Sequence, residues 1–246
     1  MSAKRGTHEQ LIAGSLVDGL SSVVAAAHEL KSPLALVRQL SLMLEMGELS
    51  PDESHRLLRQ ISLTSERALR LTSDLTRAAR LDGAMFDLEP INPIQLCEDI
   101  VHELTPLFAA HGRNVHLRGR RNPLLLVANR DLLRRIIINF SDNALHYSLE
   151  GSPVEIEVRS LQAGQVIRLG VRDHGPAISN DIWKSLRTKL SVAPQPVHSR
   201  PQSSGLGLYI ASQFADAMNG SIGVTRHHDG ATFYVDLSAS RQLSWL

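Results

Sequence analysis

The sequence has few of the features that would tie it to an oxidising compartment, a membrane or a nucleic acid. Its one cysteine, Cys97, cannot form a disulfide within the chain. No apolar run is long enough to cross a bilayer, and the start, MSAKRGTHEQ, lacks the apolar stretch of a secretory signal. The formal net charge of +1 shows neither the basic excess of a nucleic-acid binder nor an acidic tail. We therefore expect a cytoplasmic protein with no membrane segment and no nucleic-acid partner.

The composition leaves room for more than one folded unit. With 246 residues, of which 43% are apolar, the chain can bury one or two ordinary hydrophobic cores. The pattern also changes near residue 84, from long heptads to short mixed elements. We therefore predict a short tail at 1–13, a helical hairpin at 14–84, a mixed domain at 85–240 and a second tail at 241–246.

The first of these units has the spacing of a helical hairpin. Apolar positions recur alternately every four and three residues over 16–44 and again over 57–78, which is a heptad seam. Between them, MGELSPDE supplies a glycine, a helix cap at Ser50 and a proline at the first helical position, Pro51. Because two such helices cannot cover their own apolar stripes, we expect a second copy to complete a four-helix bundle.

A histidine stands at an exposed position on the first seam. Ala27 and Leu30 point inward, so His28 should face solvent. A lone histidine on a helix surface is usually a solvated side chain. Here Pro33 follows within the helix and cannot donate to the carbonyl of Glu29, so the helix should bend beside His28. This combination favours a functional histidine.

The run HELKSPL, at 28–34, resembles the H-box of bacterial sensor histidine kinases, whose usual form is close to HE-L-R/K-T/N-P-L. The resemblance implies that His28 attacks the γ-phosphate of ATP through one ring nitrogen, while Glu29 hydrogen-bonds the other. Ser32 stands where the family often has threonine or asparagine, a position linked to hydrolysis of the phosphorylated response regulator. Its hydroxyl can orient water, which implies phosphatase activity; the alternative is a solvated polar residue.

The mixed domain should be an α+β sandwich. We expect a short strand, FDLEPI, and a helix that is capped by Asn92, begins at Pro93 and ends near Gly112. The alternating runs VEIEV and VIRLGV predict one hairpin, and Asp229-Gly230 predicts another between SIGVTR and ATFYVDL. Interleaved helices and antiparallel strands are typical of this class.

Asn139 and Asn143 share one face of a predicted helix, with His146 a further three residues along. An isolated N-x-x-x-N is a weak signal, but NFSDNALHY, at 139–147, resembles the kinase N-box, N-x-x-[DE]-N-A-x-[KR]-[FY]. The resemblance implies that the carbonyl oxygen of Asn143 ligates Mg²⁺ and that Asn139 supports the phosphates or the metal's waters. Tyr147 fills the last position of the box. His146 replaces a lysine or arginine, which weakens a phosphate contact.

Two further segments resemble glycine boxes. VRDHGPAI, at 171–178, is similar to D-x-G-x-G and implies that Asp173 accepts the adenine exocyclic N–H, while Gly175 lets backbone approach the base. SSGLGL, at 203–208, is similar to G-x-G-L-G-L and precedes a helical run. Ala177 and Ser203 each replace a glycine. The second box implies phosphate contacts at a helix start from a set of four residues: Gly205, Leu206, Gly207 and Leu208.

The segment between the two glycine boxes occupies the place of the family's ATP lid. It is polar and carries the cations Arg187, Lys189 and Arg200, which are candidate phosphate contacts. A segment of this kind is otherwise often a simple disordered loop. Trp183 stands where the family has its phenylalanine box, and Leu186 takes the place of the second aromatic.

The ordered motifs cover about residues 14–239. The resemblance implies a dimeric four-helix bundle followed by an α/β sandwich of the Bergerat (GHKL) ATPase type. It also implies a kinase that uses ATP and Mg²⁺ to phosphorylate His28 and then an aspartate on the receiver domain of a response regulator. The residues before the first helix leave no room for a sensor domain. We therefore expect either an excised catalytic core or a signal that arrives through a separate sensor protein.

Two other functions are also compatible with the sequence. A nucleotide-binding interaction module, or a degenerate kinase dominated by phosphatase activity, is favoured by His146, Ala177 and Ser203. An ATPase clamp of the gyrase, mismatch-repair or chaperone kind shares the nucleotide fold. The H-box hairpin, and the absence of a following transducer domain, argue against the clamp.

Overall fold

The computed structural model describes residues 27, 30–47, 49–78, 80–81, 86–119, 124–184, 186 and 206–243. Across these ranges, no helix combines the length and the apolarity needed to span a membrane. Several predicted site residues lie outside the described residues: His28, Glu29, Arg187, Lys189, Arg200, Ser203 and Gly205.

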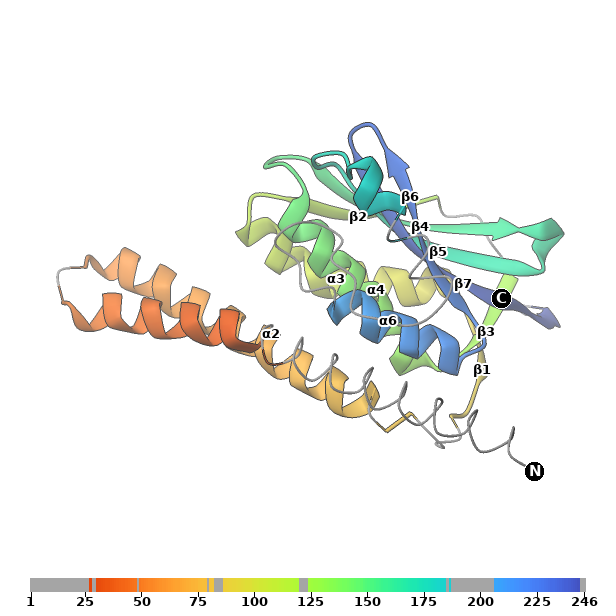
Figure 1. Cartoon of the computed structure of the whole chain (residues 1–246), viewed down its shortest axis with the longest axis horizontal. Helices are drawn as coiled ribbons and strands as arrows, with labels where there is room; N and C mark the ends of the chain where they lie inside the picture. The colour runs from red at the N-terminus through yellow and green to blue at the C-terminus, as the bar shows by residue number, and fades with distance from the viewer. Residues whose placement is uncertain are drawn as a thin grey trace, which may run out of the picture.

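The chain begins with a helical hairpin. Residues 30–45 are helical, and α2 (Pro51–Ala78) returns antiparallel to them (Figure 1). The predicted start of α2 is confirmed, because the Ser50 hydroxyl accepts from the N–H of Glu53 at 3.3 Å and Pro51 is the first helical residue. The Ser50 N–H donates back to the Glu53 carboxylate at 2.9 Å, which completes a capping box. The Ser50 hydroxyl also donates to the Glu53 carboxylate at 2.7 Å, and this bond, together with the one from the Ser50 N–H, lowers the pKa of Glu53.

The apolar side chains of the hairpin are only partly covered by the chain itself. Leu40 is buried, but Leu34, Leu58 and Leu69 are 60%, 53% and 71% exposed. Leu34 belongs to the predicted seam, so the seam is not closed within one hairpin. Large apolar side chains left in water at this density are typical of a surface that meets a partner.

Seven strands form one sheet in the order β1-β3-β7-β5-β4-β2, with β6 paired to β7. In chain order the elements are β1 (Glu89–Ile91), α3 (Pro93–Ala110), β2 (Asn114–Arg118), β3 (Leu124–Ala128), α4 (Arg130–Tyr147), β4 (Pro153–Leu161), the 3₁₀ turn η1 (Gln162–Gly164), β5 (Val166–Asp173), α6 (Leu206–Ala217), β6 (Ser221–His227) and β7 (Gly230–Leu243). All strand pairs are antiparallel except β2 with β4.

The local signals in the sequence placed most of these elements. Both predicted hairpins are confirmed: β4 pairs with β5, and β6 with β7. The helix α3 begins at Pro93, with the Asn92 side chain accepting from the N–H of Ile94 at 3.0 Å. The strands β2 and β3 were not predicted, and FDLEPI forms a strand only over Glu89–Ile91.

The two faces of the sheet differ sharply. Helices α3, α4 and α6 cover one face (Figure 1) and share a core with its strands. Cys97 on α3 lies in this core, where burial and the neighbouring Glu98 raise the pKa of its thiol to about 12. The other face is polar, with the side chains of Glu155, Glu157, Arg168, Arg172, Thr232, Tyr234 and Asp236.

The C-terminal half of α2 packs against this domain. Leu71, Leu75 and Ala78 are partly buried against the core, and α2 contacts α6. Asp74, which is 5% exposed, pairs with Arg135 on α4. Partial burial lowers the pKa of Arg135, so the pair is held in a poorly solvated position.

Candidate active site

The helix α4 carries the predicted asparagines along its length. Its other side, with Leu133, Ile136 and Phe140, is buried in the core, while Asn139 and Asn143 are only half-buried. His146 is exposed and Tyr147 is half-buried at the end of the helix. The period of the helix therefore leaves the two amides at the edge of the core rather than within it.

One of these amides is incompletely satisfied. The Nδ2 atom of Asn139 is buried and has no hydrogen-bond partner in the part of the chain that the structure describes. A buried donor without an acceptor costs about 1–3 kcal/mol, so such a group usually finds its acceptor in a ligand or a bound water. An oxygen of a phosphate group, or of a metal-bound water, has the required chemistry. The residues present therefore fit a Mg-nucleotide beside α4.

Asp173 is the last residue of β5, a strand paired on both sides. It is 2% exposed, and Gly175 and Ile178, which follow it, are also buried. A carboxylate buried at the end of a central strand can accept a hydrogen bond from a ligand's N–H group, because little water competes for that bond. Ala177 is exposed and does not have a positive φ, so alanine is accommodated there without backbone strain.

The described end of the second glycine box, Leu206–Leu208, forms the first residues of α6, so Gly207 lies within this helix and not before it. Leu206 and Leu208 bury their side chains in the core, so a phosphate could meet only their backbone. Gly207 lies between them, and no atom of the described residues stands within 4 Å of the position that a Cβ would take. The open space at Gly207 leaves room for a ligand close to the backbone at the start of α6.

The predicted site residues come from elements that pack together. The helix α4 contacts both α6 and β5, which brings the N-box, Asp173 and Gly207 to one side of the sheet. Tyr147 and His146 lie at the end of the same helix. Ser32, in contrast, is exposed on the first helix of the hairpin. Trp183 is half-buried beside the domain core, and Leu186 is fully buried in it.

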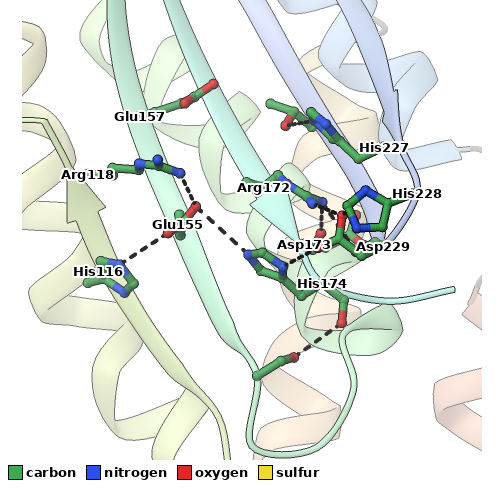
Figure 2. Close-up of polar contacts among 12 residues, drawn as sticks. His116, Arg118, Glu155, Glu157, Arg172, Asp173, His174, His227, His228 and Asp229 are labelled. Carbon is green, nitrogen blue, oxygen red and sulfur yellow. Dashed lines mark hydrogen bonds and ion pairs between the residues drawn. The ribbon is translucent and has the colours of Figure 1, made fainter. Parts of the chain in front are cut away.

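Three polar residues near the site were not singled out from the sequence. Asp142 is half-buried on α4, at the acidic position of the N-box pattern, and that pattern itself could have identified it. His174 and Asp229 form a hydrogen bond, with Nδ1 of His174 3.1 Å from Oδ2 of Asp229 (Figure 2). Because His174 and Asp229 are 55 residues apart in the sequence, no local pattern indicated that they meet.

Partial desolvation opposes ionisation of Asp229, but hydrogen bonds from His174 and Arg172 outweigh it and lower the pKa of Asp229 to about 2. The Asp229 carboxylate therefore stays ionised well below neutral pH.

Comparison with known proteins agrees with this geometry. Residues 128–241 match the family of histidine kinase-, DNA gyrase B- and HSP90-like ATPases. The matched residues include α4, β5 and α6. Curated relatives that are similar to the chain are named as sensor histidine kinases.

Those relatives match most of the chain. The sensor protein kinase PmrB of Pseudomonas aeruginosa is 30% identical over 83% of this chain and 42% of its own length. The histidine protein kinase SaeS of Staphylococcus epidermidis is 28% identical over 84% of this chain and 59% of its own length. The chain therefore spans less than two thirds of the length of either relative.

Solved structures share the fold. A histidine kinase ThkA, in complex with the response regulator protein TrrA, has a TM-score of 0.64 at 18% identity, over 96% of this chain and 65% of that chain. Full-length ShkA in complex with AMPPNP has a TM-score of 0.61 at 23% identity, over 93% of this chain and 47% of that chain.

Proposed function

We propose that this chain is the catalytic core of a two-component sensor histidine kinase. It uses ATP to phosphorylate His28 and then passes the phosphoryl group to an aspartate of a response regulator. The observation that supports the proposal is that α4, which carries Asn139, contacts both β5, which carries Asp173, and α6, which carries Gly207, and that Nδ2 of Asn139 is buried without a hydrogen-bond partner among the described residues. The domain division at residue 84, with a hairpin before it and an ATP-binding domain after it, belongs to the same proposal.

The nucleotide would lie between α4, β5 and the start of α6. The buried carboxylate of Asp173 would accept the adenine amino group, and Gly175 would let the backbone approach the base. Asn139 would donate its unpartnered Nδ2 hydrogen to a phosphate oxygen or a metal-bound water. His146 and Tyr147 would flank the phosphates at the end of α4, and a second set would contact them through backbone N–H groups: Gly205, Leu206, Gly207 and Leu208.

The carbonyl oxygen of Asn143 would hold Mg²⁺. The described part of the chain has no group of three or more His, Cys, Asp and Glu residues able to hold a metal ion alone. Mg²⁺ is commonly bound by one or two protein oxygens together with substrate phosphates, so one amide oxygen is a sufficient protein contribution. When bound, Mg²⁺ neutralises charge on the transferred phosphoryl group.

His28 would act as a nucleophile in its neutral form. A bond forms between the γ-phosphorus and one ring nitrogen, the bond from that phosphorus to the bridging oxygen breaks, and ADP leaves. Glu29 would accept the hydrogen bond of the other ring N–H and stabilise the positive charge that develops on the ring. The ring nitrogen then releases the phosphoryl group to a receiver-domain aspartate.

Two properties of the hairpin complete the proposal. Its uncovered leucines, Leu34, Leu58 and Leu69, would pair with those of a second copy in a homodimeric four-helix bundle. Ser32 is exposed, so its hydroxyl could orient a water molecule against the phosphorylated response regulator. This placement supports a phosphatase activity besides the kinase activity.

The test is a radiolabel assay with γ-labelled ATP. We expect wild-type protein to acquire acid-labile phosphate. His28→Ala should lose all label while its nucleotide affinity, measured by calorimetry, stays unchanged, because the acceptor lies in the hairpin. Asn143→Ala and Asp173→Ala should lose both affinity and label. Label that persists on His28→Ala would remove His28 from the mechanism, and unchanged Mg-ATP affinity in either of the other variants would refute that assignment.

A further inference from the structure

A cluster of charged side chains lies on the open face of the sheet, at the end of β5 that carries Asp173 (Figure 2). Arg172 is nearly buried there; its Nη1 donates to the backbone carbonyl of Asp173. Its Nη2 donates to Oδ1 of Asp229 over 2.5 Å. Because Asp229 stands in the turn between β6 and β7, one guanidinium ties that turn to the backbone of Asp173.

His174 makes a second tie to the same turn. Its Nδ1 lies 3.1 Å from Oδ2 of Asp229, so the two oxygens of this carboxylate serve Arg172 and His174 separately. The Nε2 of His174 lies 3.9 Å from Oε2 of Glu155 on β4. Arg172 and His174, which flank Asp173 in the sequence, are therefore both held by the carboxylate of Asp229.

The backbone of His174 is held as well, from the side of α4. Its carbonyl accepts from the N–H of Leu149 at 2.9 Å and from the hydroxyl of Ser152 at 3.3 Å. Both residues belong to the segment that follows α4. His174 thus connects the end of the asparagine-bearing helix, the strand end at Asp173 and the β6–β7 turn.

The turn also touches Asp173 directly. Gly230 has a φ of +131°, and a Cβ placed on it would lie 2.2 Å from the carbonyl oxygen of Asp173 and 2.7 Å from its Oδ1. Such distances are far inside van der Waals contact. Only glycine lets the turn approach so closely, which leaves the Asp173 carboxylate backed by the turn.

We propose that Arg172, His174 and Asp229 are positioning residues that fix Asp173 for recognition of the adenine base. The inference rests on the proposed role of Asp173. A single carboxylate discriminates between bases only if it is held within about 0.5 Å of its productive position. A strand end followed by a loop does not hold a side chain that firmly by itself. The contacts of Arg172, His174 and Asp229 supply the missing rigidity, from the face of the sheet opposite to the nucleotide.

The chain offers a matched control on the same face. Arg168 and Asp236 lie on β5 and β7, and Nε and Nη2 of Arg168 donate to the two carboxylate oxygens of Asp236, both over 2.7 Å. Like the contact between Arg172 and Asp229, this pair joins an arginine of β5 to a carboxylate on the open face of the sheet. Arg168 lies four residues before Arg172 on β5, and therefore further from Asp173 along the strand.

The experiment compares nucleotide affinity with thermal stability in the full chain. Dissociation constants for Mg-ATP and Mg-GTP are measured by calorimetry, and melting temperatures are measured without nucleotide. Asp229→Ala and Arg172→Met should each weaken Mg-ATP binding about tenfold and reduce the preference for ATP over GTP. Asp229→Asn, which keeps an acceptor oxygen, should recover part of the affinity. Asp236→Ala should lower the melting temperature but leave both constants unchanged.

Two further variants complete the test. The double variant Arg172→Met with Asp229→Ala should bind no more weakly than the worse single variant, because the two share one contact. Asp173→Ala should abolish binding. Suppose that Asp173→Ala abolishes binding. If Asp229→Ala then binds ATP normally, or if Asp236→Ala weakens ATP binding as much as Asp229→Ala does, the positioning role is wrong while the proposed function stands. If Asp173→Ala binds normally, the assignment of Asp173 fails, and the positioning role fails with it.

Discussion

The hairpin and the ATPase domain use their apolar residues in different ways. In the domain, large side chains such as Phe108, Phe140 and Phe214 are fully buried by the chain's own sheet and helices. In the hairpin, Leu58 and Leu69 remain more than half exposed. The domain's sequence therefore specifies contacts within one chain, whereas the hairpin's specifies contacts that one chain cannot complete. The C-terminal half of α2 belongs to both, through its packing on the domain.

The largest effect should come from charging the uncovered face of α2. Leu58→Glu combined with Leu69→Glu places carboxylates where the proposed dimer is dry, and should weaken self-association about 100-fold or more. Nucleotide affinity should not change. Analytical ultracentrifugation over a concentration series gives the dimer constant. A double variant that remains as dimeric as wild type would show that this face is not the interface.

Truncating the domain core should affect folding rather than association. Phe214→Ala removes a fully buried ring on α6 and should lower the free energy of unfolding of the domain by about 3–5 kcal/mol. Leu69→Ala, on the exposed face of α2, is its counterpart. In urea unfolding at concentrations where the chain is monomeric, it should cost no more than about 0.5 kcal/mol. Equal losses for the two variants would contradict the contrast between the regions.

The junction between the two regions contains one buried ion pair and one exposed pair. Asp74→Ala leaves Arg135 without its partner in a poorly solvated position, and should cost about 2 kcal/mol of stability. Asp131→Ala breaks only the exposed contact with Arg77 at 3.5 Å, and should cost about 0–1 kcal/mol. Urea unfolding measures both. The junction would be held by apolar contacts alone if Asp74→Ala behaved like Asp131→Ala.

The smallest effect is a pH dependence within the domain. The pKa of Asp229 is lowered from 3.8 to about 2 in the folded chain, so its ionised form stabilises the fold. This contribution is complete above about pH 4 and is lost as the pH falls toward 2. Wild type should therefore be more stable than Asp229→Asn at pH 7, and the gap should shrink below pH 4. A gap that stays constant between pH 7 and pH 3 would contradict the assignment.

Local signals in the sequence identified elements that are bounded by strong caps and turns. Ser50 with Pro51, and Asn92 with Pro93, placed two helix starts correctly, because a cap satisfies backbone N–H groups within a few residues. The strands β2 and β3 gave no such signal. Each has five residues, and the pairing that stabilises it, with β4 or with β1 and β7, is distant in the sequence.

The residues of the candidate site also divide into those that local sequence patterns identified and those that they did not. Asn139 and Asn143 could be recognised because one helix places them together, and Asp173 because a motif surrounds it. The hydrogen bonds from Arg172 and His174 to Asp229 could not be recognised from the sequence, because β5 and the β6–β7 turn meet only when the sheet forms. The motif showed that Ala177 replaces a glycine but not whether this strains the backbone, and the structure shows that its φ is not positive. Backbone conformation at that position depends on the packed loop.

The buried thiol has a practical consequence for labelling. Cys97 is the one cysteine of the sequence, it is 0% exposed, and its pKa is about 12, so almost none of it is thiolate at neutral pH. The folded protein should therefore behave toward maleimides as if it had no cysteine. A cysteine introduced on the surface of α2, and another on the ATPase domain, could carry a dye pair without a cysteine-free background. Distances between hairpin and domain would then be measurable in the otherwise native sequence.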